Sequence, residues 1–314
     1  MGVRVELRIA PPRDPSGPDP QRSAATARAA LDELDRTLTR FSEDSELSRL
    51  NADPRRVVPA SPTLRAAVRA ALDAAQASRG LVDPTLLGPL RRAGYAATMR
   101  DVASAPLRDA LATAPPRRAA AAHPARAWTR VEVDDEAGTI SRPPGIGLDL
   151  GGSAKGLAAD LVARALEPHR RFLVDMAGDL AIGRPDPSAA PYNVGIVEPF
   201  DDGVVHEVEI AGGGIATSGV GSRLWADGNG GHAHHLLDPA TGEPAWTGVV
   251  MATALAPTTL QAETLAKQAV LGGPAVARRL LARQGGMLVL DDGSVELQGR
   301  LKPRVRLRMP GAPG

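Results

Sequence analysis

The first forty residues change from a strand-like period of two to helical spacing. Apolar and polar side chains alternate over residues 1–9 (Met-Gly-Val-Arg-Val-Glu-Leu-Arg-Ile), which predicts a half-buried β-strand. A proline-rich polar loop follows. Leu31, Leu34 and Leu38 then fall on one face of a helix that we predict over about 20–40.

A second helix is predicted from its start signal. Ser61 is a good N-cap, and Pro62 suits the first helical residue because its missing N–H would be unpaired there in any case. Helical spacing then puts Leu64, Val68 and Leu72 on the buried face.

Short apolar runs dominate the second half of the chain, interrupted by helical patterns at 153–167, 259–271 and 274–284. Several runs follow one another without an intervening helix. This favours an α+β fold with a mixed, largely antiparallel sheet flanked by helices over a regular βαβ winding. The predicted strands are 128–133, 172–174, 193–197, 204–210, 249–256, 287–290 and 305–309.

Length and composition restrict the class of protein. A chain of 314 residues can bury a core without disulfides or a structural metal. We expect a single domain over 1–314, in which the Ala-, Pro- and Arg-rich segment 102–127 is a variable, mobile connector with a short helix and no chemistry. The absence of cysteine excludes disulfides, thiolate catalysis and Cys-ligated zinc.

Charge and hydropathy bear on partners and compartment. A net charge of +1 gives no broad cationic surface, so nucleic acid is not an expected partner. No segment approaches the roughly 18 consecutive apolar residues of a membrane span. Residues 1–9 lack the apolar stretch of a secretion signal, and a cytoplasmic protein is predicted.

Lysine is rare, and one lysine lies among glycines. Only three of the 37 basic residues are lysines, and Lys155 falls in the run 149–156 (Asp-Leu-Gly-Gly-Ser-Ala-Lys-Gly). Glycines let the backbone approach a ligand closely, and helical spacing over 157–166 would place this run at a helix N-terminus, where anions bind. The run predicts a phosphate or pyrophosphate site. A plain strand-to-helix turn with a solvated lysine is the alternative.

Other segments carry polar side chains suited to catalysis. Three of the six histidines, His232, His234 and His235, lie close together, but their spacing lacks the usual ligand set of zinc. One histidine directed into a cleft, with the other two solvated, is favoured, and it would serve as a general base near neutral pH. Asp179 follows a predicted strand, where aspartate commonly forms turns.

Together these segments resemble the FAD:protein FMN transferase family, the ApbE-type flavin transferases, in motif content and motif order. The resemblance covers nearly the whole chain. The motifs that carry it are 45–51 (Ser-Glu-Leu-Ser-Arg-Leu-Asn), 83–85 (Asp-Pro-Thr), 149–160 (Asp-Leu-Gly-Gly-Ser-Ala-Lys-Gly-Leu-Ala-Ala-Asp), 177–179 (Ala-Gly-Asp), 216–219 (Ala-Thr-Ser-Gly) with Arg223, and 235–242 (His-Leu-Leu-Asp-Pro-Ala-Thr-Gly).

The resemblance implies an ApbE-like fold and an enzyme with FAD as substrate. Such an enzyme cleaves the pyrophosphate of FAD, transfers the FMN moiety to a threonine hydroxyl of an acceptor flavoprotein and releases AMP, assisted by Mg²⁺. Two alternatives remain. An FAD pyrophosphatase would use the same site with water as acceptor and give FMN and AMP, and a non-catalytic FAD-binding protein would leave the cofactor intact.

The resemblance also implies residue roles. His235 matches the histidine proposed to take the proton of the accepting threonine, and Asp179 joins it as a catalytic position with a less defined role. Phe41 matches the aromatic that stacks on the flavin, and Leu237 lines the adenine side. The other implied cofactor contacts are Met1, Leu81, Val82, Asp83, Asp149, Lys155 and Thr217.

The implied metal site departs from the family pattern. Gly152, through its carbonyl, Glu263, Ala266 and Lys267 occupy the metal positions, where the family commonly has an aspartate and, four residues later, a threonine. Glutamate can ligate Mg²⁺, whereas a protonated lysine cannot. As a plain i,i+4 ion pair, Glu263 and Lys267 would contribute about 0.2–0.5 kcal/mol. Either the Lys267 ammonium supplies part of the charge of the metal, or the site is weakened and the protein mainly binds FAD.

Overall fold

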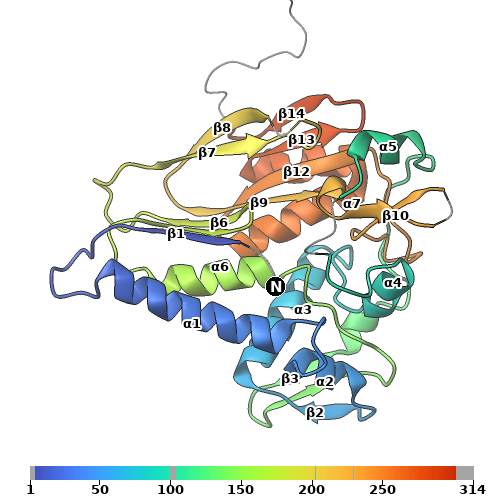
Figure 1. Ribbon diagram of the computed structural model, residues 1–314, viewed down its shortest axis with the longest axis horizontal. Coiled ribbons are helices and arrows are strands. Elements are labelled where there is room, and N and C mark those ends of the chain that lie inside the picture. The colour runs from blue at the N-terminus through green and yellow to red at the C-terminus, as the bar shows by residue number, and fades with distance from the viewer. Residues whose placement is uncertain (1–3, 100–103, 202, 229, 302–314) are drawn as a thin grey trace, which may run out of the picture.

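A seven-stranded antiparallel sheet forms the centre of the computed structural model, which describes residues 4–99, 104–201, 203–228 and 230–301 (Figure 1). Every pair of neighbouring strands in this sheet is antiparallel. The strand order is β1 (Val5–Ile9), β5 (Phe172–Met176), β6 (Asp179–Gly183), β9 (Gly213–Gly219), β12 (Val249–Ala256), β13 (Gly286–Leu290) and β14 (Val295–Gln298).

Helices cover one face of the sheet and a hairpin covers part of the other. The helix α6 (Ala154–Ala165) packs on β5 and β6, and α7 (Thr259–Gln284) packs on β9 and β12. The helices α1 (Pro20–Leu38) and α3 (Pro62–Ala77) form a further layer against α6. On the opposite face, the paired strands β7 (Tyr192–Val197) and β8 (Val204–Ile210) bury apolar side chains against the sheet.

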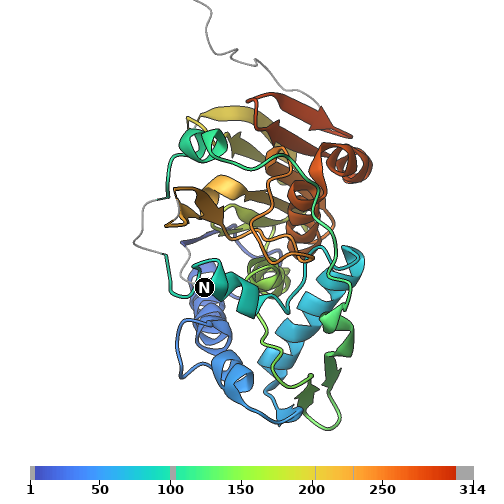
Figure 2. The same cartoon turned by 90° about the vertical axis from the view of Figure 1, so that its right-hand side faces the viewer.

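The remaining described elements are short. Figure 2 shows the N-terminal helices, in blue to cyan, below the C-terminal strands, in yellow to red. These short elements are β2 (Val57–Pro59), β3 (Glu132–Asp134), β4 (Thr139–Ser141), β10 (Leu224–Ala226), β11 (His232–His234), α2 (Glu46–Ala52), α4 (Leu87–Arg92), α5 (Leu107–Ala112), and the 3-10 turns Ala127–Arg130 and Val220–Ser222.

The predicted helix signals are confirmed. The Ser61 hydroxyl accepts a hydrogen bond from the Leu64 amide at 3.1 Å, and Pro62 is the first residue of α3. The two predicted C-terminal helices form one element, α7, which is broken at Gly273 (φ 74°), just before Pro274. The predicted boundary between them therefore survives as a kink. None of the described helices is long and apolar enough to cross a membrane.

Several strand predictions need correction. The predicted strand 128–133 is mostly a 3-10 turn, and only its end joins β3. Asp179 does not stay in a turn, because Ala177 (φ 54°) and Gly178 (φ 91°) form a tight hairpin turn, and Asp179 begins β6. The central strand β9 was not predicted at all. The predicted strand 305–309 and Met1 lie outside the described residues.

The segment 102–127 contains the expected short helix, α5, in its described part. Beyond α5 it has no regular structure but is held in place along its length. The Arg118 amide donates to the Trp246 carbonyl at 2.9 Å, and the Ala120 amide donates to the Leu271 carbonyl at 2.9 Å. These bonds attach the segment to the loop before β12 and to α7, and the mobility of the connector stays a prediction.

Candidate active site

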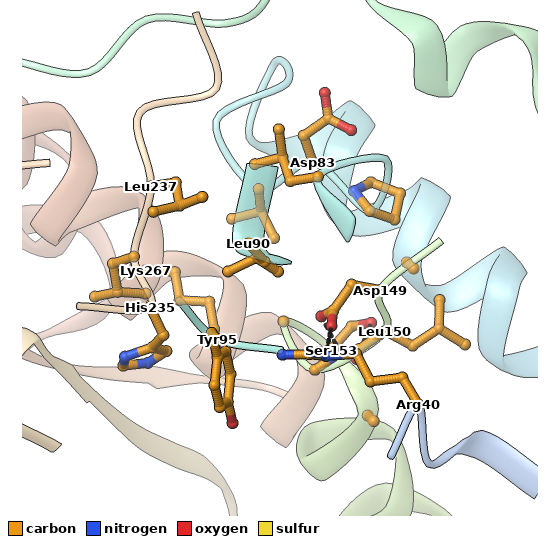
Figure 3. Close-up of a pocket in the computed structure, with 18 of the residues that line it drawn as sticks. Arg40, Asp83, Leu90, Tyr95, Asp149, Leu150, Ser153, His235, Leu237 and Lys267 are labelled. Atoms are coloured by element: carbon orange, nitrogen blue, oxygen red, sulfur yellow. Dashed lines mark hydrogen bonds and ion pairs between the residues drawn. The ribbon is translucent and has the colours of Figure 1, made fainter. Parts of the chain in front are cut away.

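A cleft opens between the N-terminal helical layer and the loop that precedes β12. Figure 3 shows His235, Lys267 and Leu237 on one wall, and Arg40 with Asp149 on the other. The predicted site residues that line the cleft are Phe41, Leu81, Val82, Asp83, Asp149, Gly152, Lys155, His235, Leu237 and Lys267. The sequence therefore identified ten of the residues that line the cleft, from five separate segments.

The glycine-rich run leads into the first turn of α6, as predicted. The Asp149 carboxylate accepts a hydrogen bond from the Gly151 amide at 2.9 Å and so holds the turn. Gly156 has a different role from the one expected. A Cβ at Gly156 would lie 2.6 Å from the Leu260 Cα, so this glycine lets α6 approach α7 and does not face a ligand.

Two ammonium–carboxylate pairs lie at the junction of α6, α7 and the sheet. Lys155 Nζ is 2.7 Å from Asp179 Oδ2, and Lys267 Nζ is 2.8 Å from Glu263 Oε1. The lysines line the cleft, while the carboxylates lie beneath them and are at most 1% exposed. Asp179 and Glu263 thus do not line the cleft themselves but hold the two cations that do.

The protonation states follow from burial and charge. Burial opposes the charge of Lys155, but the Asp179 and Glu263 carboxylates outweigh it, and the pKa of the ammonium is raised. Burial raises the pKa of Glu263, while Lys267 acts in the opposite direction. The Gly156 amide also donates to Glu263 Oε2 at 2.9 Å, so both oxygens of this carboxylate are engaged.

His235 is the histidine that reaches the cleft. Desolvation, followed by Arg223 and His234, lowers the pKa of His235 well below its ordinary value, and Lys267 adds to the effect. The imidazole is therefore neutral at physiological pH and free to accept a proton.

The other two histidines only partly follow the prediction. His232 lies 3.1 Å from the Thr113 hydroxyl near the surface. His234 is fully buried, so the expectation that it is solvated is wrong. Its ring packs edge-on against Trp246 with centroids 4.7 Å apart, and burial lowers its pKa to about 3.

The Thr217 side chain lies away from the cleft. Its hydroxyl is 2.8 Å from the Thr253 hydroxyl and lines a groove on the opposite face of the sheet. Only its backbone faces the charged pairs, because the Thr217 amide donates to Asp179 Oδ1 at 3.3 Å. Ala266, another predicted site residue, is fully buried in α7.

Sequence reasoning missed Arg40 and Tyr95, which both line the cleft. Arg40 Nε is 2.5 Å from Asp149 Oδ2, and the guanidinium lies 4.3 Å from the Phe41 ring centre and 4.4 Å from that of Tyr95. Arg40 Nη1 and Nη2 are buried and have no hydrogen-bond partner within the described part of the chain. The only signal in the sequence was that Arg40 is adjacent to Phe41.

The residues present do not fit a divalent cation. Within the described ranges, no three His, Asp or Glu side chains come together as a ligand group. Glu263 has both oxygens engaged, and its partner four residues later is an ammonium. A dication placed here would meet two lysines and no free carboxylate.

The cleft combines an aromatic wall, apolar side chains, Lys155 at the N-terminus of α6 and Lys267 within α7. These features define a protein that binds a ligand with a flat ring system and phosphates, such as a nucleotide cofactor. The chain belongs to the ApbE family, whose model matches residues 1–290.

Known relatives agree with this assignment. The chain is 31% identical over 271 residues to the FAD:protein FMN transferase of Klebsiella pneumoniae, covering 83% of this chain and 74% of that protein. It is 30% identical over 312 residues to that of Treponema pallidum, with 91% and 84% covered. The crystal structure of the ApbE protein from Thermotoga maritima shares the fold, with a TM-score of 0.76 at 23% identity over 95% of this chain and 94% of that chain.

Proposed function

We propose that this protein is an FAD:protein FMN transferase, which moves the FMN moiety of FAD to a threonine hydroxyl of an acceptor flavoprotein and releases AMP. The observation that carries the proposal is one cleft in which an exposed aromatic, an ammonium and a neutral imidazole converge, in Phe41, Lys155 and His235. The relatives in Klebsiella pneumoniae and Treponema pallidum bear that name, which supports the same activity here.

The cleft suggests how FAD lies. Phe41 is 42% exposed and next to the partly satisfied Arg40 guanidinium, so this end suits the flavin ring with its carbonyl acceptors. Lys155 suits the pyrophosphate, because an ammonium neutralises phosphate charge at the N-terminus of α6. Leu237 lies on the opposite wall and suits the adenine side.

The reaction needs positioning and charge neutralisation more than covalent chemistry by the protein. The threonine oxygen attacks the phosphorus of the FMN half, and its proton passes to the neutral imidazole of His235. The bond between that phosphorus and the bridging oxygen breaks, and AMP leaves with the bridging oxygen. Lys155, held by Asp179, offsets the charge that develops on the phosphates.

A single mixture distinguishes the candidate activities. The purified protein is incubated with FAD and a peptide that carries the acceptor threonine, and the products are separated by mass spectrometry. FMN on the peptide supports the transferase. Free FMN and AMP would indicate the pyrophosphatase instead, and bound but intact FAD the non-catalytic protein. A peptide with alanine in place of threonine is the control.

Three related points remain proposals. The acceptor is a flavoprotein with an accessible threonine, and cross-linking during turnover would identify it. The cytoplasmic location predicted from the sequence is tested by fractionation of the host cell. The single domain predicted over 1–314 is tested by calorimetry, where it requires one cooperative unfolding transition.

A further inference from the structure

We propose that the Lys267 ammonium takes the place of the divalent cation, so that this chain binds FAD and transfers FMN without Mg²⁺. The transfer part of this inference rests on the proposed function, whereas the binding part does not. The inference is drawn because the charged residues of the cleft do not fit the Mg²⁺ that the ApbE family implies.

Lys267 lies where a cation could contact a bound phosphate. Its side chain lines the cleft but is only 8% exposed, so the ammonium is presented to a ligand and largely shielded from water. Glu263 holds it at 2.8 Å, one turn earlier on α7. A shielded, fixed cation of this kind interacts more strongly with phosphate than a solvated one.

The oxygens of Glu263 are already engaged and are not available as metal ligands. Glu263 is fully buried, and its oxygens accept from Lys267 Nζ and from the Gly156 amide. Mg²⁺ would have to displace the ammonium from Oε1 and then remain next to it. Since a protonated amine is no ligand, the position four residues after Glu263 repels the cation that a threonine there would bind.

The two lysines and the two carboxylates that hold them balance each other in charge. Lys155 and Lys267 face Asp179 and Glu263, two positive against two negative charges, and Lys155 is influenced by both carboxylates. The group is neutral before any ligand binds. The two ammoniums line the cleft, whereas the two carboxylates lie beneath them, so a bound pyrophosphate would meet the positive groups first.

A plain structural ion pair is the competing explanation. It would leave FAD affinity unchanged when Lys267 is replaced, provided that the protein folds. The comparison therefore uses FAD binding as its first measurement, with no dependence on turnover.

Calorimetric titration with FAD is performed in EDTA and in Mg²⁺, on the wild type, Lys267→Thr and Arg28→Thr. Arg28 forms an exposed i,i+4 pair with Asp32 on α1 and serves as the matched control. We expect equal wild-type affinity in both buffers. Lys267→Thr should bind about tenfold or more weakly in EDTA and recover in Mg²⁺, because a charge-assisted phosphate contact is lost and a ligand oxygen is gained.

Two results would overturn the inference: a wild-type affinity that depends on Mg²⁺, or a folded Lys267→Thr protein that binds FAD in EDTA as the wild type does. The wild-type comparison needs no variant, so misfolding of Lys267→Thr does not leave the question open. Circular dichroism melting of each protein reports folding.

Transfer to the peptide in EDTA is the second measurement. Wild-type transfer should proceed at the same rate with and without EDTA, and wild-type transfer that stops in EDTA contradicts the inference. If no transfer occurs in either buffer while FAD binding follows the expected pattern, the proposed function fails and the ammonium substitution stands.

Discussion

His235 combines a neutral imidazole with a place on the cleft wall, which gives it a distinct pH dependence. Its pKa is lowered in the free protein, chiefly by burial, so protonation is not reached as the pH falls through the ordinary value of about 6.5. We expect kcat/KM for FMN transfer to stay level between about pH 8 and pH 6, because kcat/KM reports the free enzyme. A pH series of initial rates measures this, and a steep fall centred near 6.5 would contradict it.

Arg40 Nη1 and Nη2 are buried and find no partner among the described residues, which is costly unless a ligand supplies acceptors. We expect Arg40→Gln to raise the Kd for FAD by about tenfold or more, since a bond to a charged donor is lost. Fluorescence titration of FAD measures the change. Arg36→Gln is the control, because Arg36 lies in the last turn of α1, four residues before Arg40, and its side chain is 73% exposed. Equal affinities of both variants would show that Arg40 only supports Asp149.

Single residues differ in how far the sequence reveals them. The positions with distinctive chemistry, Lys155 among glycines and the His235 motif, were found and line the cleft. Thr217 was placed by its motif, but the pleat of β9 turns its hydroxyl to the other face of the sheet. Arg40 was missed because arginine is common in this chain and only the fold shows its nitrogens to be buried.

At the scale of elements, the close contact of α6 with α7 positions both charged pairs. An alanine at Gly156 would bring its Cβ to 2.6 Å from the Leu260 Cα and 2.9 Å from Glu263 Oε2. We expect Gly156→Ala to lower the free energy of unfolding by about 1–3 kcal/mol through overpacking, and to weaken FAD binding. Urea denaturation measures the first effect. Gly203→Ala should be nearly silent, because no atom of the described residues lies within 4 Å of a Cβ there.

The same close packing explains which elements the sequence revealed. Helices with caps and strands with alternating buried and exposed side chains were predicted, as in α3 and β8. The central strand β9 was invisible because its small residues give no alternation of size or polarity. Those residues are small for a reason, since a Cβ at Gly214 would lie 2.4 Å from the Thr259 amide at the start of α7. Contact between distant segments, not local preference, determines β9.

At the scale of the whole molecule, a buried neutral histidine makes stability depend on pH. The pKa of His234 is about 3 in the folded state and near 6.5 when unfolded, so this contribution is complete above pH 6.5 and declines as the pH falls toward 3. Between pH 7 and pH 5 it costs about 2 kcal/mol. Urea denaturation at both pH values should show a smaller loss in His234→Phe than in the wild type. Equal losses would indicate that other groups dominate.

The cleft lies between two hydrophobic cores, one around α1, α3 and α6 and one between α7 and the strands. The class of fold could be predicted because strand followed strand along the chain. The position of the cleft between the two cores could not be predicted in this way. Segments near residues 40, 83, 150 and 235 converge only when α6 docks against α7. The family resemblance indicated that these segments form one site, which periodicity alone did not indicate.

The kink at Gly273 divides the longest described helix into parts with separate tasks. The part before it holds Glu263 and Lys267, while the part after it packs on β13 and β14 and pairs Arg278 with Glu296. Substitutions in the part after Gly273 can thus change the thermal stability of the protein without altering the residues of the cleft. Evolution, or a protein engineer, can therefore adjust thermal stability separately from the catalytic rate.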